Sequence, residues 1–403
     1  MKRTNKKFAP MLLTAAFAIG LVACGGDDGG SSSSSEAPST EAPTSEAPST
    51  EAPATDEPVV VDCAPDEGPL KAAWVYVGPT NDGGWTQAHD EARLAVQEHF
   101  GDAIETTYKE NVPEGPEVAQ TIEDLIADGN TVIFGTSFGF QDAFVEAAAA
   151  HPDVCFEFAT GYLTSTNMAQ FYGAAEDTDY LAGMAAGAAS ATGKLGYLAS
   201  FPIAEVVRGV NAWAMGARAV NPDATIKVVW LNTWFDPAKE KQAAEALIAE
   251  GYDVLGQKGV DSPATGDAAS AAEGVAWAGY NTDQSANYPD VWLTATVYHW
   301  DVYQIPRLQQ VLDGTWTTGN YYGNLGDGFV TLAPYGDLVS DETRALIDAK
   351  KEELSAAPGS QFTGPIKDNQ GNEVLADGVA HTFDELMTMA YLVEGVDGEI
   401  PAS

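Results

Sequence analysis

The chain has few basic residues for its size. Its 403 residues include 19 Lys and Arg against 59 Asp and Glu, which gives a formal net charge of −40 at pH 7. A surface with that excess repels phosphate backbones and anionic lipid headgroups, so nucleic acid is excluded as a partner. The same charge favours solubility and suits a saline habitat, where salt screens self-repulsion.

Histidine and cysteine are also scarce, with five and three residues respectively. The histidines show no metal-ligand spacing, and no Ser–His–Asp set can be placed in one group of loops. The glycine-rich stretch 81–85, NDGGW, lacks the lysine of a phosphate-binding loop and carries an aspartate that would repel phosphate. The sequence therefore predicts no catalytic residue, no metal site and no cofactor.

The first 24 residues read as a targeting segment. Basic residues precede an apolar stretch, 8–22, whose 15 residues fall short of the roughly 20 that a membrane-spanning helix needs. The stretch ends in Leu-Val-Ala-Cys24, which resembles a bacterial lipobox. We therefore predict lipidation at Cys24 and a location on the outer side of the cell membrane, held by the lipid anchor only. An ordinary cleaved signal with a chance cysteine is the alternative.

Residues 25–66 contain a Ser/Thr/Glu/Ala/Pro repeat of period five. This composition has almost nothing apolar to bury, so we expect a disordered tether between the membrane and a folded body. Linkers of this kind also join domains of secreted glycosidases. A tethered glycosidase with paired carboxylates therefore stays open as an alternative function.

Two further cysteines lie in the body of the chain. Cys63 precedes the first predicted strand, and Cys155 begins the segment VCFEFAT. In a parallel sheet both would lie at the same edge, and the exterior of a cell permits disulfides. We expect a Cys63–Cys155 bridge, with two separate buried thiols as the alternative.

From Leu70 onward, apolar strands alternate with helical segments, which predicts an α/β protein with parallel sheets. One run of strands covers 71–78, 103–110, 131–136, 154–160 and 167–173, and a second run begins at 194–200 and 225–233. Two Rossmann-like lobes with a ligand cleft at their carboxyl edges follow from this repetition. The expected ranges are 67–190 for the N-terminal lobe, 191–291 for the C-terminal lobe, 292–328 for a return to the first and 329–403 for a return to the second.

Aromatic and acidic side chains recur just after the strands of both predicted lobes. The candidates are Asp82, Trp85, Ser137, Phe138, Phe140, Trp234, Asp261 and Asp283. Rings from opposite lobes can stack on a flat heterocycle, and carboxylates accept hydrogen bonds from its N–H groups. For any one aromatic residue the alternative is core packing, and for Asp82 it is capping of the following helix.

The stretches VGPTNDGGWTQAHDEAR, FGTSFGFQDA, YLASFPIAEVVRGVNAWAMGAR and FTGPIKD resemble the basic membrane protein, or PnrA-like, family. These are lipoprotein substrate-binding components of ABC importers, and the resemblance runs from Leu70 to Gly395. It implies a type I periplasmic-binding fold with a multi-strand hinge. It also implies a monomer that closes on a purine base or nucleoside and delivers it to permease subunits. A sensor of the same fold is the alternative.

The resemblance also implies roles for the candidate residues. Trp85 and Trp234 would stack on the base, Phe138 and Phe140 would line the cavity, Asp82 and Asp261 would accept base donors, and Asp283 would face a ribose. Two departures concern the sugar: Tyr298 and His299 stand where many nucleoside binders carry lysine, and Asn281 stands where an acid is common. The stretches TSFGF and NTWFDPAKE resemble the branch of the family associated with free bases, and this resemblance favours an adenine-like base over a nucleoside.

Overall fold

The computed structural model describes residues 59–401. Their core is two mainly parallel sheets, as the alternation of strands and helices predicts. The first sheet has the order β11-β5-β4-β3-β1-β2. Its strands are β1 (Leu70–Val75), β2 (Ile104–Lys109), β3 (Val132–Gly135), β4 (Cys155–Ala159), β5 (Met168–Gly173) and β11 (Asn320–Gly323).

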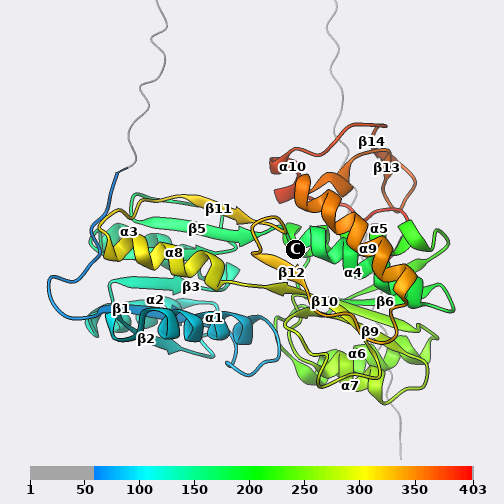
Figure 1. Ribbon diagram of the computed structural model, residues 1–403, viewed down its shortest axis with the longest axis horizontal. Helices are drawn as coiled ribbons and strands as arrows, with labels where there is room; N and C mark the ends of the chain where they lie inside the picture. Colours follow the sequence, from blue (N-terminus) through cyan, green and yellow to red (C-terminus); the bar gives the residue numbers. More distant parts are fainter. Residues whose placement is uncertain (1–58, 402–403) are drawn as a thin grey trace, which may run out of the picture. The chain divides into compact units, whose positions relative to one another are not determined.

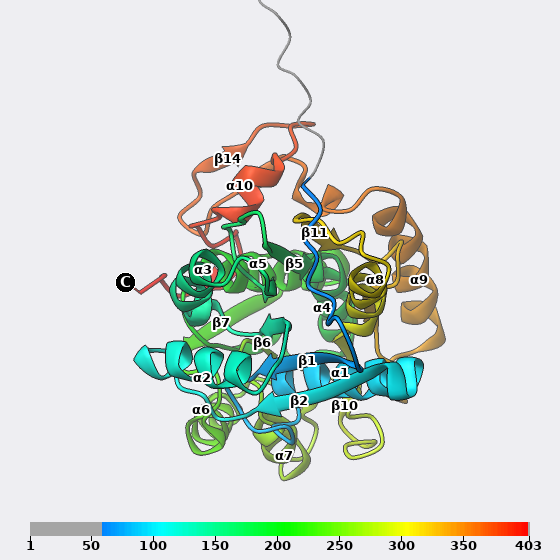
Figure 2. The ribbon, with the colours of Figure 1, turned by 90° about the vertical axis from the view of Figure 1, so that its left-hand side faces the viewer.

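Helices cover both faces of this sheet, which is why its central strands are apolar along their whole length. Every residue of β3, β4 and β5 is buried. In Figure 2, α2 (Pro116–Ala127) and α3 (Gln141–Ala150) lie on one face, and α1 (Trp85–Phe100) and α8 (Asp301–Leu312) lie on the other. Short 3-10 turns precede or follow these elements at η1 (Gly101–Ala103) and η2 (Phe138–Phe140).

The second sheet has the order β12-β10-β9-β8-β6-β7-β15, with β12 antiparallel to β10. Its strands are β6 (Lys194–Ala199), β7 (Thr225–Trp230), β8 (Val254–Lys258), β9 (Ala276–Asn281), β10 (Trp292–Tyr298), β12 (Val330–Leu332) and β15 (Val396–Asp397). Its flanking helices are α4 (Ala175–Ala189), α5 (Ala204–Val220), α6 (Pro237–Ala249) and α7 (Ala264–Ser270). Figure 1 shows the two sheets next to each other.

Helices α4 and α5 pack together closely because both carry glycine at the contact. A Cβ on Gly183 would lie 2.1 Å from the carbonyl oxygen of Trp213, and one on Gly216 would lie 1.9 Å from that of Tyr180. The small residues of the segment 175–189 thus serve helix packing inside the second lobe.

The chain crosses between the lobes three times within residues 59–401. It leaves the first sheet after Gly173, returns after Tyr298, and leaves again after Gly323. The ranges expected from the sequence put the first two crossings at 190 and 292. The observed crossings differ from the expected ones because α4 packs on α5 of the second lobe and because β10 pairs with β9.

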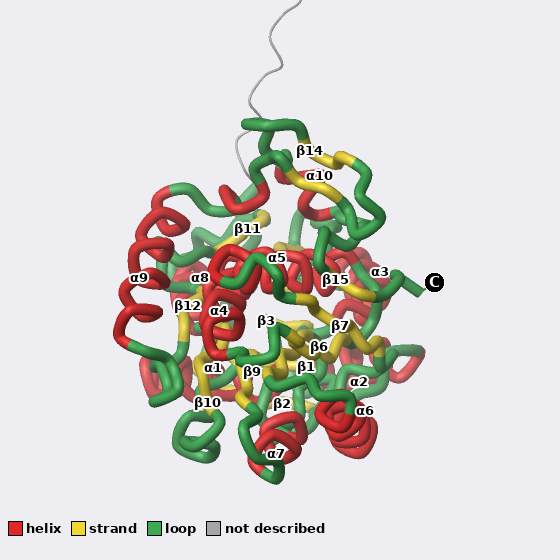
Figure 3. Tube along the Cα trace, turned by 90° about the vertical axis from the view of Figure 1, so that its right-hand side faces the viewer, coloured by secondary structure: helices red, strands yellow, loops and turns green. Residues whose placement is uncertain are grey.

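The C-terminal segment completes the second lobe. It contains α9 (Asp341–Ala356), η3 (Ser360–Phe362), the hairpin β13 (Ile366–Lys367) with β14 (Glu373–Leu375), and α10 (Phe383–Met387). Figures 1 and 3 place the hairpin and α10 on the opposite side of this lobe from α6 and α7.

In the first lobe, Cys63 and Cys155 form a disulfide with Cα atoms 5.8 Å apart. None of the helices in the described part of the chain has the length and apolar character to cross a membrane.

Candidate functional site

A small cavity of about 30 Å³ lies between the lobes, at the carboxyl ends of the strands. Its walls are Val77, Trp85, Thr136, Ser137, Phe138 and Thr160 from the first lobe and Glu205, Trp234, Gly259, Asp261 and Tyr280 from the second. Five of the eight ligand residues predicted from the sequence are among them, and both lobes contribute. The cavity therefore occupies the position that two parallel sheets provide for a ligand.

Trp85 is the first residue of α1 and is held firmly by its surroundings. Its indole Nε1 donates a hydrogen bond to the carbonyl oxygen of Thr136 at 2.6 Å. The rings of Trp300 and Tyr298 meet it edge-on, with centroids 5.0 and 5.9 Å away. Only 9% of the residue is exposed. Trp85 is thus both a cavity wall and part of the core of the first lobe.

Trp234 lies in the loop between β7 and α6 and is less enclosed. Its Nε1 donates to Glu114 of the first lobe at 3.2 Å, and its ring centroid lies 4.8 Å from that of Phe201. The same Glu114 oxygen accepts from the hydroxyl of Ser137 at 2.6 Å and from the backbone N–H of Gly139 at 2.9 Å. Glu114 therefore links the two lobes at the rim of the cavity, a role that its sequence context did not reveal.

Two carboxyl groups of the second lobe line the cavity. Asp261 is 5% exposed and accepts a hydrogen bond from the Asn281 side chain at 2.9 Å. Burial, together with the nearby charges of Asp82 and Glu240, raises the pKa of Asp261 well above its ordinary value. Burial also raises the pKa of Glu205, against the opposing effect of Lys258. Hydrogen-bond donors on a ligand would favour the ionised form of both groups.

The remaining second-lobe walls are supported from behind. Buried Glu240 accepts hydrogen bonds from the backbone N–H and the hydroxyl of Ser262 at 3.1 and 2.6 Å, which holds the loop that carries Asp261. The ammonium of Lys258 lies 4.5 Å from the ring centroid of Tyr280 and 2.7 Å from Asp179. This cation is buried behind the wall and is paired within the protein.

The glycines of the NDGGW turn allow the lobes to touch. A Cβ on Gly84 would lie 2.6 Å from the backbone oxygen of Asp261 across the cleft. Gly83 has φ +86°, and its carbonyl accepts from Thr282 of the second lobe at 2.6 Å and from Gln284 at 3.1 Å. The turn thus brings the first lobe against the second beside the cavity.

Three predicted ligand residues lie outside the cavity wall. Asp82 caps α1, because its carboxylate accepts from the backbone N–H groups of residues 84, 86 and 87 at 2.8, 2.9 and 3.0 Å. Phe140 is fully buried in the first lobe, since η2 directs it into the core while Phe138 faces the cavity. Asp283 is exposed and accepts from the backbone of Ser285. Their placement does not support the ligand contacts expected for them.

Glu205, Tyr280 and Thr160 also line the cavity, although the sequence did not single them out. Thr160 directly follows β4 and Tyr280 is next to the last residue of β9, so the rule that found the tryptophans could have found these two, whereas Glu205 lies in the first turn of α5. Thr160 has φ +67°, a conformation that β-branched residues rarely adopt. Its hydroxyl is buried and has no hydrogen-bond partner within residues 59–401. A strained, unpartnered polar residue in a cavity wall is available to a ligand.

No cluster of potential metal ligands occurs in the same range.

Comparisons with known proteins agree with this geometry. The sequence profile of a family described as "ABC transporter substrate-binding protein PnrA-like" matches residues 70–359. A purine-binding protein of Brucella abortus is 40% identical over 83% of this chain and 95% of its own length. A candidate ABC transporter glucose-binding protein of Haloferax volcanii is 40% identical over 84% of this chain and 83% of its own. The crystal structure of a solute-binding protein from Aeropyrum pernix superposes with a TM-score of 0.63 at 16% identity, over 74% of this chain and 93% of that one.

Proposed function

Because the chain belongs to the PnrA-like family of ABC transporter substrate-binding proteins, we propose that its ligand is a purine base. The type I periplasmic-binding fold, with its cleft between two lobes, is the scaffold for this role. The observation that carries the proposal is that Trp85 and Trp234, from different lobes, line one small cavity together with Asp261. Stacking on aromatic rings contributes about 1–3 kcal/mol per base.

The cavity supports a free base over a nucleoside. At about 30 Å³ the cavity is small, and a flat ring system needs less widening of it than a base with a sugar attached. Asp283, which would face a ribose, is exposed and turned to its own loop. Within the described residues no lysine lines the cavity.

The two carboxyl groups favour adenine among the bases. Adenine carries an exocyclic amine and a ring N–H, which are donors at separate edges. Asp261 and Glu205 offer acceptors at two places in the wall. Charge-assisted hydrogen bonds of this kind contribute about 1.5–3 kcal/mol each. We expect the bound protein to present this ligand to ABC permease subunits, acting without catalysis.

Calorimetric titration with adenine, adenosine, riboflavin and glucose tests the proposal. Adenine at 100 times its dissociation constant should add about 2.7 kcal/mol to the unfolding free energy. Glu205→Gln should weaken adenine binding about tenfold by removing the charge, whereas Glu342→Gln, on the exposed start of α9, should leave it unchanged. Recovery of adenosine unchanged after incubation would separate binding from glycoside hydrolysis.

Glucose is the informative competitor, because a relative of equal identity is named for it. Saturable glucose binding together with no response to any purine would overturn the proposal in favour of a sugar carrier. Riboflavin binding alone would keep the stacking geometry and change the ligand class. Adenine binding without any interaction with permease subunits in reconstituted vesicles would favour the sensor role.

We also propose that the protein is anchored through Cys24, which lies outside the described residues. Cys24→Ala should move the protein from the membrane fraction to the soluble extracytoplasmic fraction, as followed by immunoblot of fractionated cells. Retention of the variant in the membrane would contradict lipidation at this cysteine.

A further inference from the structure

A second, larger hollow of about 440 Å³ adjoins the base cavity. The two share Phe138, Thr160 and Glu205, which therefore stand between them. The other walls come from β5 and β11 of the first lobe, from the start of α5, and from α10 of the C-terminal segment. The proposed base site leaves this hollow unused.

Aromatic rings dominate the wall of the second hollow. They are Phe138, Tyr162, Phe171, Tyr172, Tyr322 and Phe383. Ring centroids of Tyr322 and Phe383 are 5.1 Å apart, and those of Tyr172 and Tyr322 are 6.1 Å apart. Tyr162 is 69% exposed and Phe383 46% exposed. Rings therefore stand both in the depth of the hollow and at its mouth.

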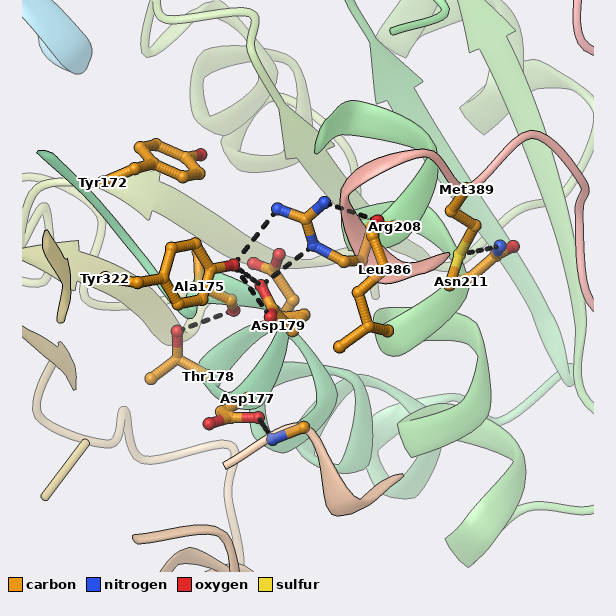
Figure 4. Close-up of polar contacts among 12 residues, drawn as sticks. Tyr172, Ala175, Asp177, Thr178, Asp179, Arg208, Asn211, Tyr322, Leu386 and Met389 are labelled. Atoms are coloured by element: carbon orange, nitrogen blue, oxygen red, sulfur yellow. Dashed lines mark hydrogen bonds and ion pairs between the residues drawn. The ribbon is translucent and has the colours of Figure 1, made fainter. Parts of the chain in front are cut away.

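The basic residue of this wall is already neutralised. The guanidinium of Arg208 donates to Glu176 at 3.2 Å, to the carbonyl oxygen of Leu386 at 2.9 Å and to the hydroxyl of Tyr322 at 3.2 Å. Figure 4 shows these contacts joining α5 to α10 and to β11. Arg208 thus holds the wall together and has little capacity left for an anion.

What the wall still offers is negative charge and hydrogen-bond acceptors. Glu205 and Asp384 line it with carboxyl groups. Gln170 is 2% exposed, and its Oε1 has no hydrogen-bond partner in the described part of the chain. A net charge of −40 on the whole protein raises the local concentration of cations further.

We propose that the second hollow is a binding site for an organic cation, an amine or quaternary ammonium compound, whose charged group lies among the aromatic rings. The negative faces of Phe and Tyr rings attract such a group, and Glu205 and Asp384 balance its charge. Glu205 stands between this hollow and the base cavity, so the two ligands would share its carboxyl group.

Choline and its uncharged isostere 3,3-dimethylbutan-1-ol test the proposal in calorimetric titrations of the full-length protein. The two differ only in charge, so choline should bind at least tenfold more tightly. Phe383→Ala and Tyr162→Ala should each weaken choline binding about two- to thirtyfold, the range that one cation–ring contact contributes. Neither ring belongs to the base cavity, so adenine binding should not change.

Tyr108→Ala is the matched control, because Tyr108 is a comparably exposed aromatic residue that lies on β2 outside the hollow. It should leave choline affinity unchanged. Equal binding of choline and the isostere, or no choline binding up to about 10 mM, would overturn the proposal while leaving the base site standing. Tyr162 lies outside α10, so a loss shared by both variants cannot be ascribed to unfolding of that helix.

Discussion

The two cavity tryptophans should respond differently to truncation, although the sequence placed both at the rim of the cleft. Trp85 is nearly buried, is surrounded by Trp300 and Tyr298, and makes a buried hydrogen bond to Thr136. Trp→Ala in such a core costs about 3–5 kcal/mol of stability. Trp234 is partly exposed and bonds to an exposed carboxylate, so its truncation should cost about 1 kcal/mol.

Urea denaturation of both variants measures this difference without ligand, and calorimetry with adenine measures binding. Trp85→Ala should lower the unfolding free energy by at least about 2 kcal/mol more than Trp234→Ala does. Both should weaken adenine binding, by about ten- to a hundredfold for Trp234→Ala.

Trp85→Phe separates the two roles of this residue. It keeps an aromatic face but removes the indole donor to the Thr136 carbonyl. We expect a stability loss of about 1–3 kcal/mol, which is the cost of leaving a buried acceptor unpaired, with adenine affinity largely retained. Equal stability of Trp85→Ala and Trp234→Ala would refute the assignment of Trp85 to the core, and unchanged adenine affinity in both would refute stacking.

Three further outcomes follow from the structure. Gly84→Ala would place a Cβ 2.6 Å from a backbone oxygen of the other lobe, so it should weaken adenine binding at least tenfold in calorimetry, whereas Gly319→Ala, with open space around it, should not. Reduction of the bridge between Cys63 and Cys155, 92 residues apart, should lower the unfolding free energy by about 4–5 kcal/mol in urea, and thiol labelling of denatured, unreduced protein would contradict the bridge. Burial and a neighbouring glutamate raise the pKa of Asp177 to about 8. The folded state therefore holds a proton that the unfolded chain releases near pH 4, and stability should fall as pH rises from about 4 to about 8, by up to about 1.4 kcal/mol per pH unit. Asp177→Asn should flatten the dependence of stability on pH in thermal melts. An unchanged slope of stability against pH would refute the assignment of this proton to Asp177.

The residues that follow the strands predicted where the cavity lies, but they did not distinguish a cavity-wall residue from a helix-capping residue. Asp82 and Asp261 both follow strands and both are buried acids. The difference is one of direction: the carboxylate of Asp82 turns back to three N–H groups of its own helix, and Asp261 reaches the cavity. The local sequence is compatible with either outcome, because an aspartate after a strand can bond to the N–H groups of its own helix or face a ligand. Only the position of the opposite lobe decides which of these occurs.

The sequence by itself determined the alternation of strands and helices, the two lobes and the edge at which a ligand would bind, because hydrophobic periodicity and turn residues are local signals. Tertiary structure alone decided the pairing of residues distant in the chain. The contact of Glu114 with Trp234 joins residues 120 apart in the chain, and α10 meets β5, α5 and β11 in the wall of the second hollow. It also placed the first crossing between the lobes after residue 173 and not at 190. The sequence of helix 175–189 does not indicate which lobe the helix packs on, whereas in the structure its glycines lie against α5 of the second lobe.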